Sequence, residues 1–120
     1  MNVVMIGAGY VGLVSGACFA EFGANVTCLD VAAGKIEALQ NGKIPIYEPG
    51  LQDIVERNLR AGRLSFTTNT GDAVRASLVV FIAVSTPPRP DGSTDLTAVE
   101  AVSREIGKVL SLTIALETGT

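Results

Sequence analysis

The chain has 120 residues, of which 48% are hydrophobic and 18% charged, and its formal net charge is −3. These values are typical of one folded domain with a hydrophobic core, and they exclude a disordered tail. They also exclude a nucleic-acid-binding surface, because the Lys and Arg residues are scattered and the charge balance is acidic.

The first forty residues predict two strand–helix units. A β-branched run at residues 3–6, stopped by Gly7, predicts a strand. We expect the helix after it to end at Gly23 and to bury one apolar face, formed by Val11, Val14, Ser15, Cys18, Phe19 and Phe22. Residues 26–29 predict a second strand that closes on Asp30, and a helix follows at about 33–40.

The rest of the chain continues the alternation. A turn-rich connection leads to a helix from Pro49 to about Arg60, with Leu51, Ile54, Val55 and Leu59 on its buried face. A short strand at 64–67 and a short helix at 72–76 precede the apolar run 78–84, which predicts a central parallel strand. Beyond a Pro/Gly-rich loop, Asp95 caps a helix whose acids form a solvated face and whose apolar face is Leu96, Val99, Val102, Ile106, Val109 and Leu110.

Residues 112–116 predict a fifth strand, and the whole pattern predicts the fold class. Alternating strands and helices require right-handed crossovers, and therefore a doubly wound α/β fold of three layers, α/β/α. The expected strand order is 3-2-1-4-5, with a ligand crevice beside strands one and four. We expect residues 1–120 to form a single Rossmann-type domain that is incomplete at its carboxyl-terminal edge.

The segment Gly7–Gly12 has the spacing Gly-x-Gly-x-x-Gly where the first strand meets the first helix. Gly7 permits a tight turn, Gly9 lets the backbone approach a pyrophosphate, and Gly12 lets the helix pack closely on the sheet. The free amides at the start of the helix point at the anion. The segment therefore predicts a dinucleotide site.

Asp30 lies 18 residues after Gly12, at the end of the second strand. A carboxylate at this place accepts hydrogen bonds from the adenosine ribose. A 2′-phosphate would meet that carboxylate, and no Arg follows in residues 31–33, so we predict NAD rather than NADP. In the purely structural alternative, the glycines only form a turn and Asp30 only ends a strand.

Three further features each allow two interpretations. Lys35 is either a solvated helix residue or a cofactor contact. Val84, Ser85 and Thr86 follow the fourth strand, where they either line the nicotinamide side or form a proline-stiffened turn. Glu48 is either catalytic or, as we favour, a first-turn acid with a local structural role.

The chain has two cysteines and no histidine. Cys18 and Cys28 form no C-x-x-C pair, so zinc and thioredoxin-like sites are excluded, and we expect small buried thiols in a reducing cytoplasm. Histidine acid–base chemistry is excluded as well. We expect no metal site, no membrane contact because the longest apolar run has only a strand's length, and no secretory signal.

Four features occur in order along the chain: GAGYVGL at 7–13, Asp30 with Lys35, NGKIPIYEPGL at 41–51, and FIAVSTPPRPDGSTDL at 81–96. Together they resemble the NAD-binding domain of the UDP-glucose/GDP-mannose dehydrogenase family over about residues 1–110. The resemblance implies NAD as the cofactor, with the glycine loop, Tyr10 and Val11 at its pyrophosphate and Asp30 and Lys35 at its adenosine ribose. It also implies that Thr86, beside Val84 and Ser85, lines the cofactor site.

The resemblance further implies an oxidoreductase that converts the C6 alcohol of a nucleotide sugar, UDP-glucose in our expectation, into a carboxylate in two NAD-dependent steps. Family members carry an essential cysteine in a later G-F-G-G-S-C-F-P-K-D segment and dimerise through later helices. We therefore expect a piece of a longer homodimeric enzyme that binds NAD without turnover and holds no catalytic residue. Cys18 and Cys28 do not take the role of that cysteine.

Two questions stay open at the level of the sequence. The family's fifth strand runs into S-T-V-P-V-G-T, and here the chain reads TIALETGT at 113–120. One alignment places Thr120 at the cofactor-contacting position and the other places Ala115 there. Two other functions also remain: a non-enzymatic nucleotide-sensing domain of a transporter, or the cofactor domain of another NAD-dependent dehydrogenase. The long connection between strands two and three favours a dehydrogenase over a minimal sensing module.

Overall fold

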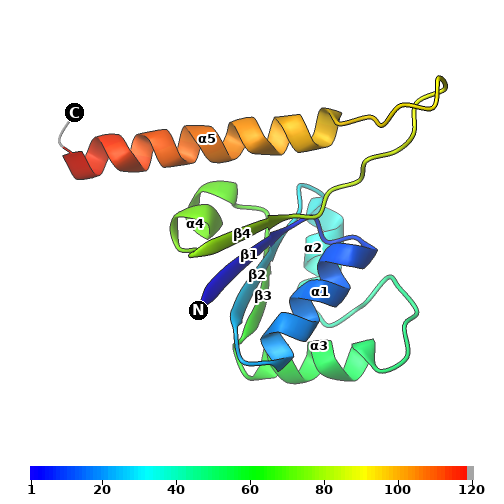
Figure 1. Ribbon diagram of the computed structural model, residues 1–120. Coiled ribbons are helices and arrows are strands. Elements are labelled where there is room, and N and C mark those ends of the chain that lie inside the picture. Colours follow the sequence, from blue (N-terminus) through cyan, green and yellow to red (C-terminus); the bar gives the residue numbers. More distant parts are fainter. Residues whose placement is uncertain (119–120) are drawn as a thin grey trace.

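The computed structural model describes the backbone of residues 1–118 and the side chains of residues 1–110. Its strands form one parallel four-stranded sheet in the order β3-β2-β1-β4 (Figure 1). The elements are β1 (Asn2–Ile6), α1 (Tyr10–Glu21), β2 (Asn25–Leu29), α2 (Ala33–Gln40), α3 (Leu51–Arg60), β3 (Leu64–Thr67), α4 (Thr70–Arg75), β4 (Val79–Ile82) and α5 (Thr97–Thr118). The predicted Rossmann-type α/β fold is confirmed.

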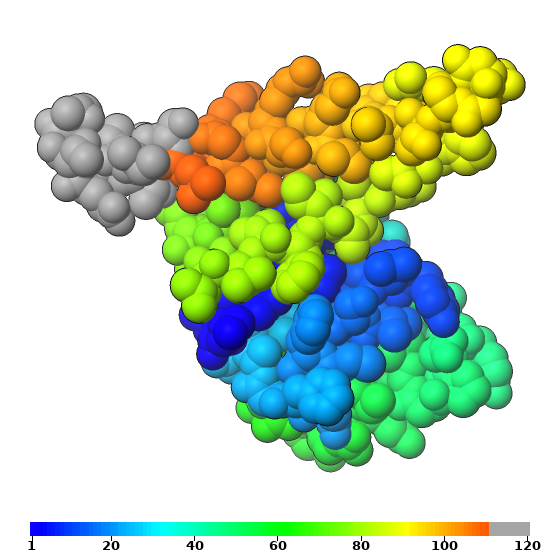
Figure 2. Space-filling view, in the orientation of Figure 1, coloured from blue at the N-terminus to red at the C-terminus, as the bar shows by residue number. Residues whose placement is uncertain are grey.

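Helices cover both faces of the sheet. α1, α2 and α3 lie on one face, and α4 and α5 lie on the other (Figure 1). Successive side chains of a strand point to opposite faces. Accordingly, Val3 and Met5 of β1 join the larger buried cluster, and Val4 and Ile6 join a smaller cluster with residues of α4 and α5. In the space-filling view, residues 97–110 of α5 form a ridge along the top of the molecule (Figure 2).

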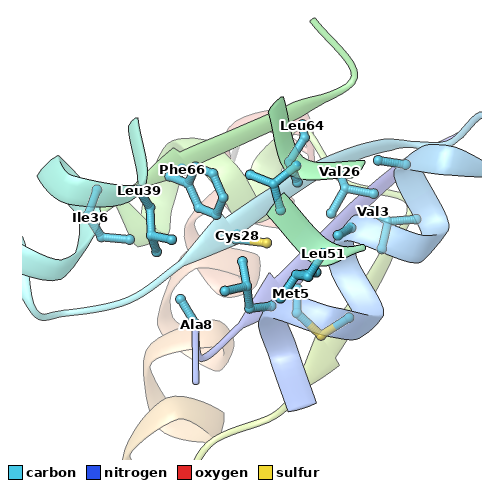
Figure 3. Close-up of a cluster of buried hydrophobic side chains, with 14 residues drawn as sticks. Val3, Met5, Ala8, Val26, Cys28, Ile36, Leu39, Leu51, Leu64 and Phe66 are labelled. Carbon is cyan, nitrogen blue, oxygen red and sulfur yellow. The ribbon is translucent and has the colours of Figure 1, made fainter. Parts of the chain in front are cut away.

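The larger cluster surrounds Cys28, whose side chain lies among apolar residues of β1, β2, β3 and the covering helices (Figure 3). Burial raises the pKa of the Cys28 thiol to about 12. A thiolate is the nucleophilic form of cysteine. We therefore expect iodoacetamide at pH 8 to leave Cys28 unmodified in the folded protein and to modify it fully in urea, as measured by peptide mass spectrometry. Modification of Cys28 without denaturant would contradict this packing.

The buried face of α1 differs from the predicted one. Its buried residues are mostly small: Gly12, Leu13, Gly16, Ala17 and Ala20. The predicted Val11 and Phe22 are 64% and 88% exposed. The reason is the close approach of α1 to the sheet, since a Cβ on Gly16 would lie only 2.8 Å from Cys28 Sγ. Because apolar residues surround the whole helix, periodicity does not identify the face that packs.

α3 begins later than predicted and contains a buried polar residue. Gly50 precedes it in the left-handed region (φ 83°), so the helix starts at Leu51 rather than at Pro49. The fully buried Asn58 donates from Nδ2 to Glu21 Oε2 (2.6 Å) and accepts from Arg63 Nε at Oδ1 (3.0 Å). These bonds satisfy the buried amide and connect α3 to the end of α1. The sequence pattern gave no sign of this network.

β4 is shorter than predicted and lies at the edge of the described sheet. It spans Val79–Ile82, and Phe81 and Ile82 are each 40% exposed. Val79 packs against the larger cluster and Val80 against the smaller one. The apolar run therefore correctly indicates two covered faces. It does not show whether another strand lies alongside, and the prediction of a central strand is wrong for the described residues.

The predicted fifth strand at 112–116 is absent, because α5 continues to Thr118. No Gly or Pro lies between Lys108 and Leu116 to end the helix. Val102, Ile106 and Val109 pack toward the sheet as predicted, whereas Leu96 and Leu110 are 45% and 47% exposed. The described residues include no helix that is long and apolar enough to cross a membrane.

The start of α4 also differs from its prediction. The helix begins at Thr70 rather than Asp72, because the Asn69 side chain accepts the Asp72 backbone N–H (3.1 Å) and caps the helix. This places Thr70 at the carboxyl-terminal side of the sheet. Thr120, one of the predicted cofactor contacts, lies outside the described residues.

Candidate functional site

The turn after β1 lies between the ends of two neighbouring strands. The Gly7 N–H donates to the Leu29 carbonyl oxygen at the end of β2 (2.7 Å). On the other side, a Cβ added to Gly7 would lie 2.5 Å from the Ala83 carbonyl oxygen just after β4. Gly7 also has a positive φ of 104°, which disfavours residues with a side chain. The position therefore requires glycine for both space and conformation.

The amino terminus of α1 faces open space. The first intrahelical bond runs from the Leu13 N–H to the Gly9 carbonyl (2.9 Å), so the amides of residues 10–12 precede it. No atom lies within 4 Å of a Cβ built on Gly9, and the first turn of α1 holds no acidic residue. Uncommitted amides and the positive end of the helix dipole together make a site for an anion.

Gly12 packs in the opposite sense, toward the protein. A Cβ there would fall on the Gly7 carbonyl oxygen and lie 3.4 Å from Met5 Cγ. The three glycines of the motif therefore differ in their surroundings. Gly7 and Gly12 are enclosed by backbone, and Gly9 is open to a ligand.

Asp30 extends from the end of β2 toward this turn. Its Oδ2 accepts the Ala8 backbone N–H (2.9 Å) and its Oδ1 accepts the Ala32 N–H (3.0 Å). Lys35 Nζ lies 3.4 Å from Oδ2, and the Asp30 side chain is only 14% exposed. The aspartate therefore fixes the glycine turn as well as ending the strand, because its carboxylate binds the amide of Ala8 within that turn.

The protonation of Asp30 follows from these contacts. Burial by itself raises the pKa of the carboxyl. The amides of Ala32 and Ala8 and the Lys35 ammonium outweigh that effect and hold the pKa of Asp30 below its ordinary value. At neutral pH the group is an anion that can only accept hydrogen bonds, as ribose hydroxyls require.

A cleft of about 440 Å³ opens beside Asp30, within the size range of small-ligand sites. It lies at the carboxyl ends of β1 and β2, with α5 as its far wall. The lining residues are Ile6, Gly7, Leu29, Asp30, Val31, Thr70, Val84, Ala98, Ala101, Val102 and Glu105. Sequence reasoning identified only Gly7, Asp30 and Val84 among them as site residues. A second cleft of about 220 Å³ lies at the amino ends of the strands, away from the glycine turn.

The other predicted residues lie around this cleft in different ways. Val84 lines it, whereas Ser85 and Thr86 follow as exposed residues of the loop. The phenol of Tyr10 turns to the connection before α3, where it donates to Glu48 Oε2 (2.8 Å). That hydrogen bond raises the pKa of Tyr10. Glu48, which lies in the segment before α3, therefore holds that segment to the first turn of α1.

No group of three His, Cys, Asp or Glu side chains within the described part of the chain is placed to hold a metal ion. Cys18 is partly exposed on α1 and Cys28 is buried in the core. The site therefore consists of a glycine turn, a helix amino terminus, an anchored carboxylate and an apolar cleft.

The chain is similar to known proteins over most of its length. Residues 1–115 match the family model described as "UDP-glucose/GDP-mannose dehydrogenase family, NAD binding domain". The chain is 59% identical over 107 residues to UDP-glucose 6-dehydrogenase of Rhizobium meliloti (strain 1021). The matched segment covers 88% of this chain and 24% of that protein. The chain is 52% identical over 110 residues to UDP-glucose 6-dehydrogenase TuaD of Bacillus subtilis (strain 168), covering 92% and 24%.

Solved structures of dehydrogenases also resemble this chain in fold. A ternary complex of GDP-mannose dehydrogenase from Pseudomonas aeruginosa matches with a TM-score of 0.86 and 43% identity, over 89% of this chain and 24% of that one. A UDP-glucose dehydrogenase from Pyrobaculum islandicum matches with a TM-score of 0.85 and 45% identity, over 90% and 25%. The chain therefore spans about a quarter of the length of these relatives.

Proposed function

The chain belongs to the UDP-glucose/GDP-mannose dehydrogenase family and is an NAD-binding domain of it, and on that premise we propose that it serves an enzyme that oxidises the C6 alcohol of UDP-glucose to a carboxylate in two NAD-dependent steps. The cofactor part of the proposal rests on Asp30, an ionised carboxylate held between the glycine turn and the cleft. The reaction at C6 rests on the identity to proteins named UDP-glucose 6-dehydrogenase. NAD accepts the hydride in such a reaction.

Each part of the site has a role in this proposal. The amides at the start of α1 hold the pyrophosphate, and the open space at Gly9 lets it approach. Asp30 accepts hydrogen bonds from the adenosine ribose, with Lys35 beside it. Ser85 and Thr86 lie at the nicotinamide side, because they follow β4 next to the glycine turn, and Val84 before them lines the cleft beside Asp30.

UDP-glucose is the substrate that the relatives favour. The proteins at 59% and 52% identity are named for UDP-glucose, whereas a GDP-mannose 6-dehydrogenase of Pseudomonas syringae matches at 40%.

No residue of this chain is proposed to be catalytic, so the chain alone binds NAD without turnover, and the homodimer forms through other regions. We place the enzyme in the cytoplasm, since both cysteines are free thiols. Family membership favours this function over a nucleotide-sensing domain of a transporter.

Calorimetric titration of the chain with NAD and with NADP tests the proposal. We expect NAD to bind more tightly by about tenfold or more, because a 2′-phosphate would stand against the Asp30 carboxylate. Equal affinity for the two dinucleotides would contradict the role given to Asp30.

A turnover assay tests the second part of the proposal. With UDP-glucose and NAD, the chain alone should produce no NADH above the rate of a protein-free control. Sustained NADH formation would show that this chain contains catalytic residues, contrary to the proposal.

A further inference from the structure

The first turn of α1 begins without a capping side chain. Gly9 occupies the N-cap position, and glycine brings no side chain that could accept a hydrogen bond from the free amides. The amides of residues 10–12 precede the first intrahelical bond. Gly12 packs against the Gly7 carbonyl oxygen, whereas the Val11 side chain is 64% exposed. The beginning of this turn therefore needs another contact to hold its amides in one direction.

The side chain of Tyr10 supplies such a contact. Its hydroxyl donates to Glu48 Oε2 over 2.8 Å. The Glu48 carbonyl oxygen accepts the Leu51 N–H at the start of α3 (3.1 Å), and Leu51 is buried in the larger cluster. Ile46, two residues before Glu48, also packs against that cluster. The first residue of α1 is therefore tied, through one side-chain hydrogen bond, to a segment that is anchored in the core.

The charge of Glu48 argues against a direct contact with the cofactor. A carboxylate and a pyrophosphate repel each other, and an ionised carboxylate has no proton to donate to a phosphate oxygen. What Glu48 offers is an acceptor for the Tyr10 hydroxyl. In the proposed function, on which this inference rests, the amides of the first turn hold the pyrophosphate. Amides that already have a fixed direction lose less entropy when the anion binds.

We propose that Glu48 is a positioning residue for NAD, which accepts a hydrogen bond from the Tyr10 hydroxyl and thereby fixes the first turn of α1 with its amides toward the pyrophosphate. Loss of either partner weakens NAD binding, although neither the carboxylate nor the hydroxyl needs to touch the cofactor. Because the two side chains act through one hydrogen bond, their effects on NAD affinity do not add.

A double-mutant cycle, measured by calorimetric titration with NAD, tests this role. Tyr10→Phe removes only the hydroxyl, and Glu48→Ala removes the acceptor. Each change should raise the dissociation constant for NAD about fourfold, a loss typical of one hydrogen bond. The double variant should also lose about fourfold, whereas independent effects would multiply to about sixteenfold.

Two further variants serve as controls. Glu48→Gln keeps an acceptor oxygen for the Tyr10 hydroxyl, and it should bind NAD within about twofold of the unaltered chain. Tyr47→Phe removes the hydroxyl of the neighbouring tyrosine, which is 93% exposed, and it should leave the NAD affinity unchanged.

The outcomes separate this inference from the proposed function. If the unaltered chain, shown to be folded by circular dichroism, does not bind NAD, the proposed function fails and the role of Glu48 fails with it. If the unaltered chain binds NAD, three results overturn the role of Glu48 alone: a single variant with unchanged affinity, losses that multiply in the double variant, or a Glu48→Gln loss as large as that of Glu48→Ala.

Two other results would also overturn it. Tighter NAD binding in both Glu48→Ala and Glu48→Gln would show that Glu48 acts through its charge on the pyrophosphate. Unfolding of Tyr10→Phe would show that the hydrogen bond serves the fold and not the cofactor.

Discussion

Gly12→Ala is expected to destabilise the domain by about 3 kcal/mol or more, enough to leave much of the protein unfolded. The added Cβ would fall on the Gly7 carbonyl oxygen and crowd Met5 Cγ at 3.4 Å. Gly7 has no room to move away, because it is itself confined by the Ala83 carbonyl and has a positive φ. Urea unfolding followed by circular dichroism measures the effect.

Gly9→Ala is the matched control for this change. Gly9 has a φ of −78°, and no atom lies within 4 Å of an added Cβ. The loss of stability should therefore be about 1 kcal/mol or less, the usual cost of alanine at a helix amino terminus. NAD affinity should nevertheless fall by about tenfold or more, because the methyl group occupies the space of the pyrophosphate. Equal stability of the two variants would contradict the different surroundings of these glycines.

Asp30→Asn is expected to weaken NAD binding by about tenfold to a hundredfold and to lower stability by about 1–2 kcal/mol at pH 7. The amide keeps the size of the side chain, but it has no negative charge and only one acceptor oxygen. It therefore cannot accept from Ala8, Ala32 and Lys35 as the two carboxylate oxygens do. Calorimetry with NAD and urea unfolding measure the two effects. Unchanged NAD affinity in a folded variant would contradict the ribose contact.

The difference in stability between Asp30→Asn and the unaltered chain depends on pH, and the direction of the Asp30 pKa shift determines how. The pKa of Asp30 in the folded state lies below its ordinary value of about 4. The stabilisation is therefore fully present above that ordinary value and is lost as the pH falls through the folded-state pKa. The difference in stability between Asp30→Asn and the unaltered chain should shrink below about pH 4.

Lys35→Ala, which removes only a partly exposed partner at 3.4 Å, should lower the stability by no more than about 0.5 kcal/mol.

The sequence predicted the parts of the site that depend on local geometry. The spacing of Gly7, Gly9 and Gly12 reflects a turn in which each backbone position has its own spatial limits. Asp30 followed from its distance along the chain and its place at a strand end. Its hydrogen bond to the Ala8 amide, 22 residues away, required the actual packing of β1 beside β2.

Features that depend on packing between elements were not predictable in this way. The face of α1 that packs is defined by small residues such as Gly16, because all sides of the helix are apolar. Glu105 is exposed, as predicted for the acids of this helix, and the position of α5 over the strand ends also brings it to the wall of the cleft. The prediction of a strand at 112–116 is wrong because a short apolar run without Gly or Pro fits a helix as well as a strand, and α5 continues through it.

The central claim is that NAD binds across the glycine turn and Asp30. Its most direct test is a titration of the ¹⁵N-labelled chain with NAD, followed by amide chemical shifts. The largest shifts should occur at the amides of Gly9, Val11 and Gly12 and at Asp30 and Val31. Amides around the second cleft, at the amino ends of the strands, should not move. Shifts centred on that second cleft, with the glycine turn unaffected, would contradict the account.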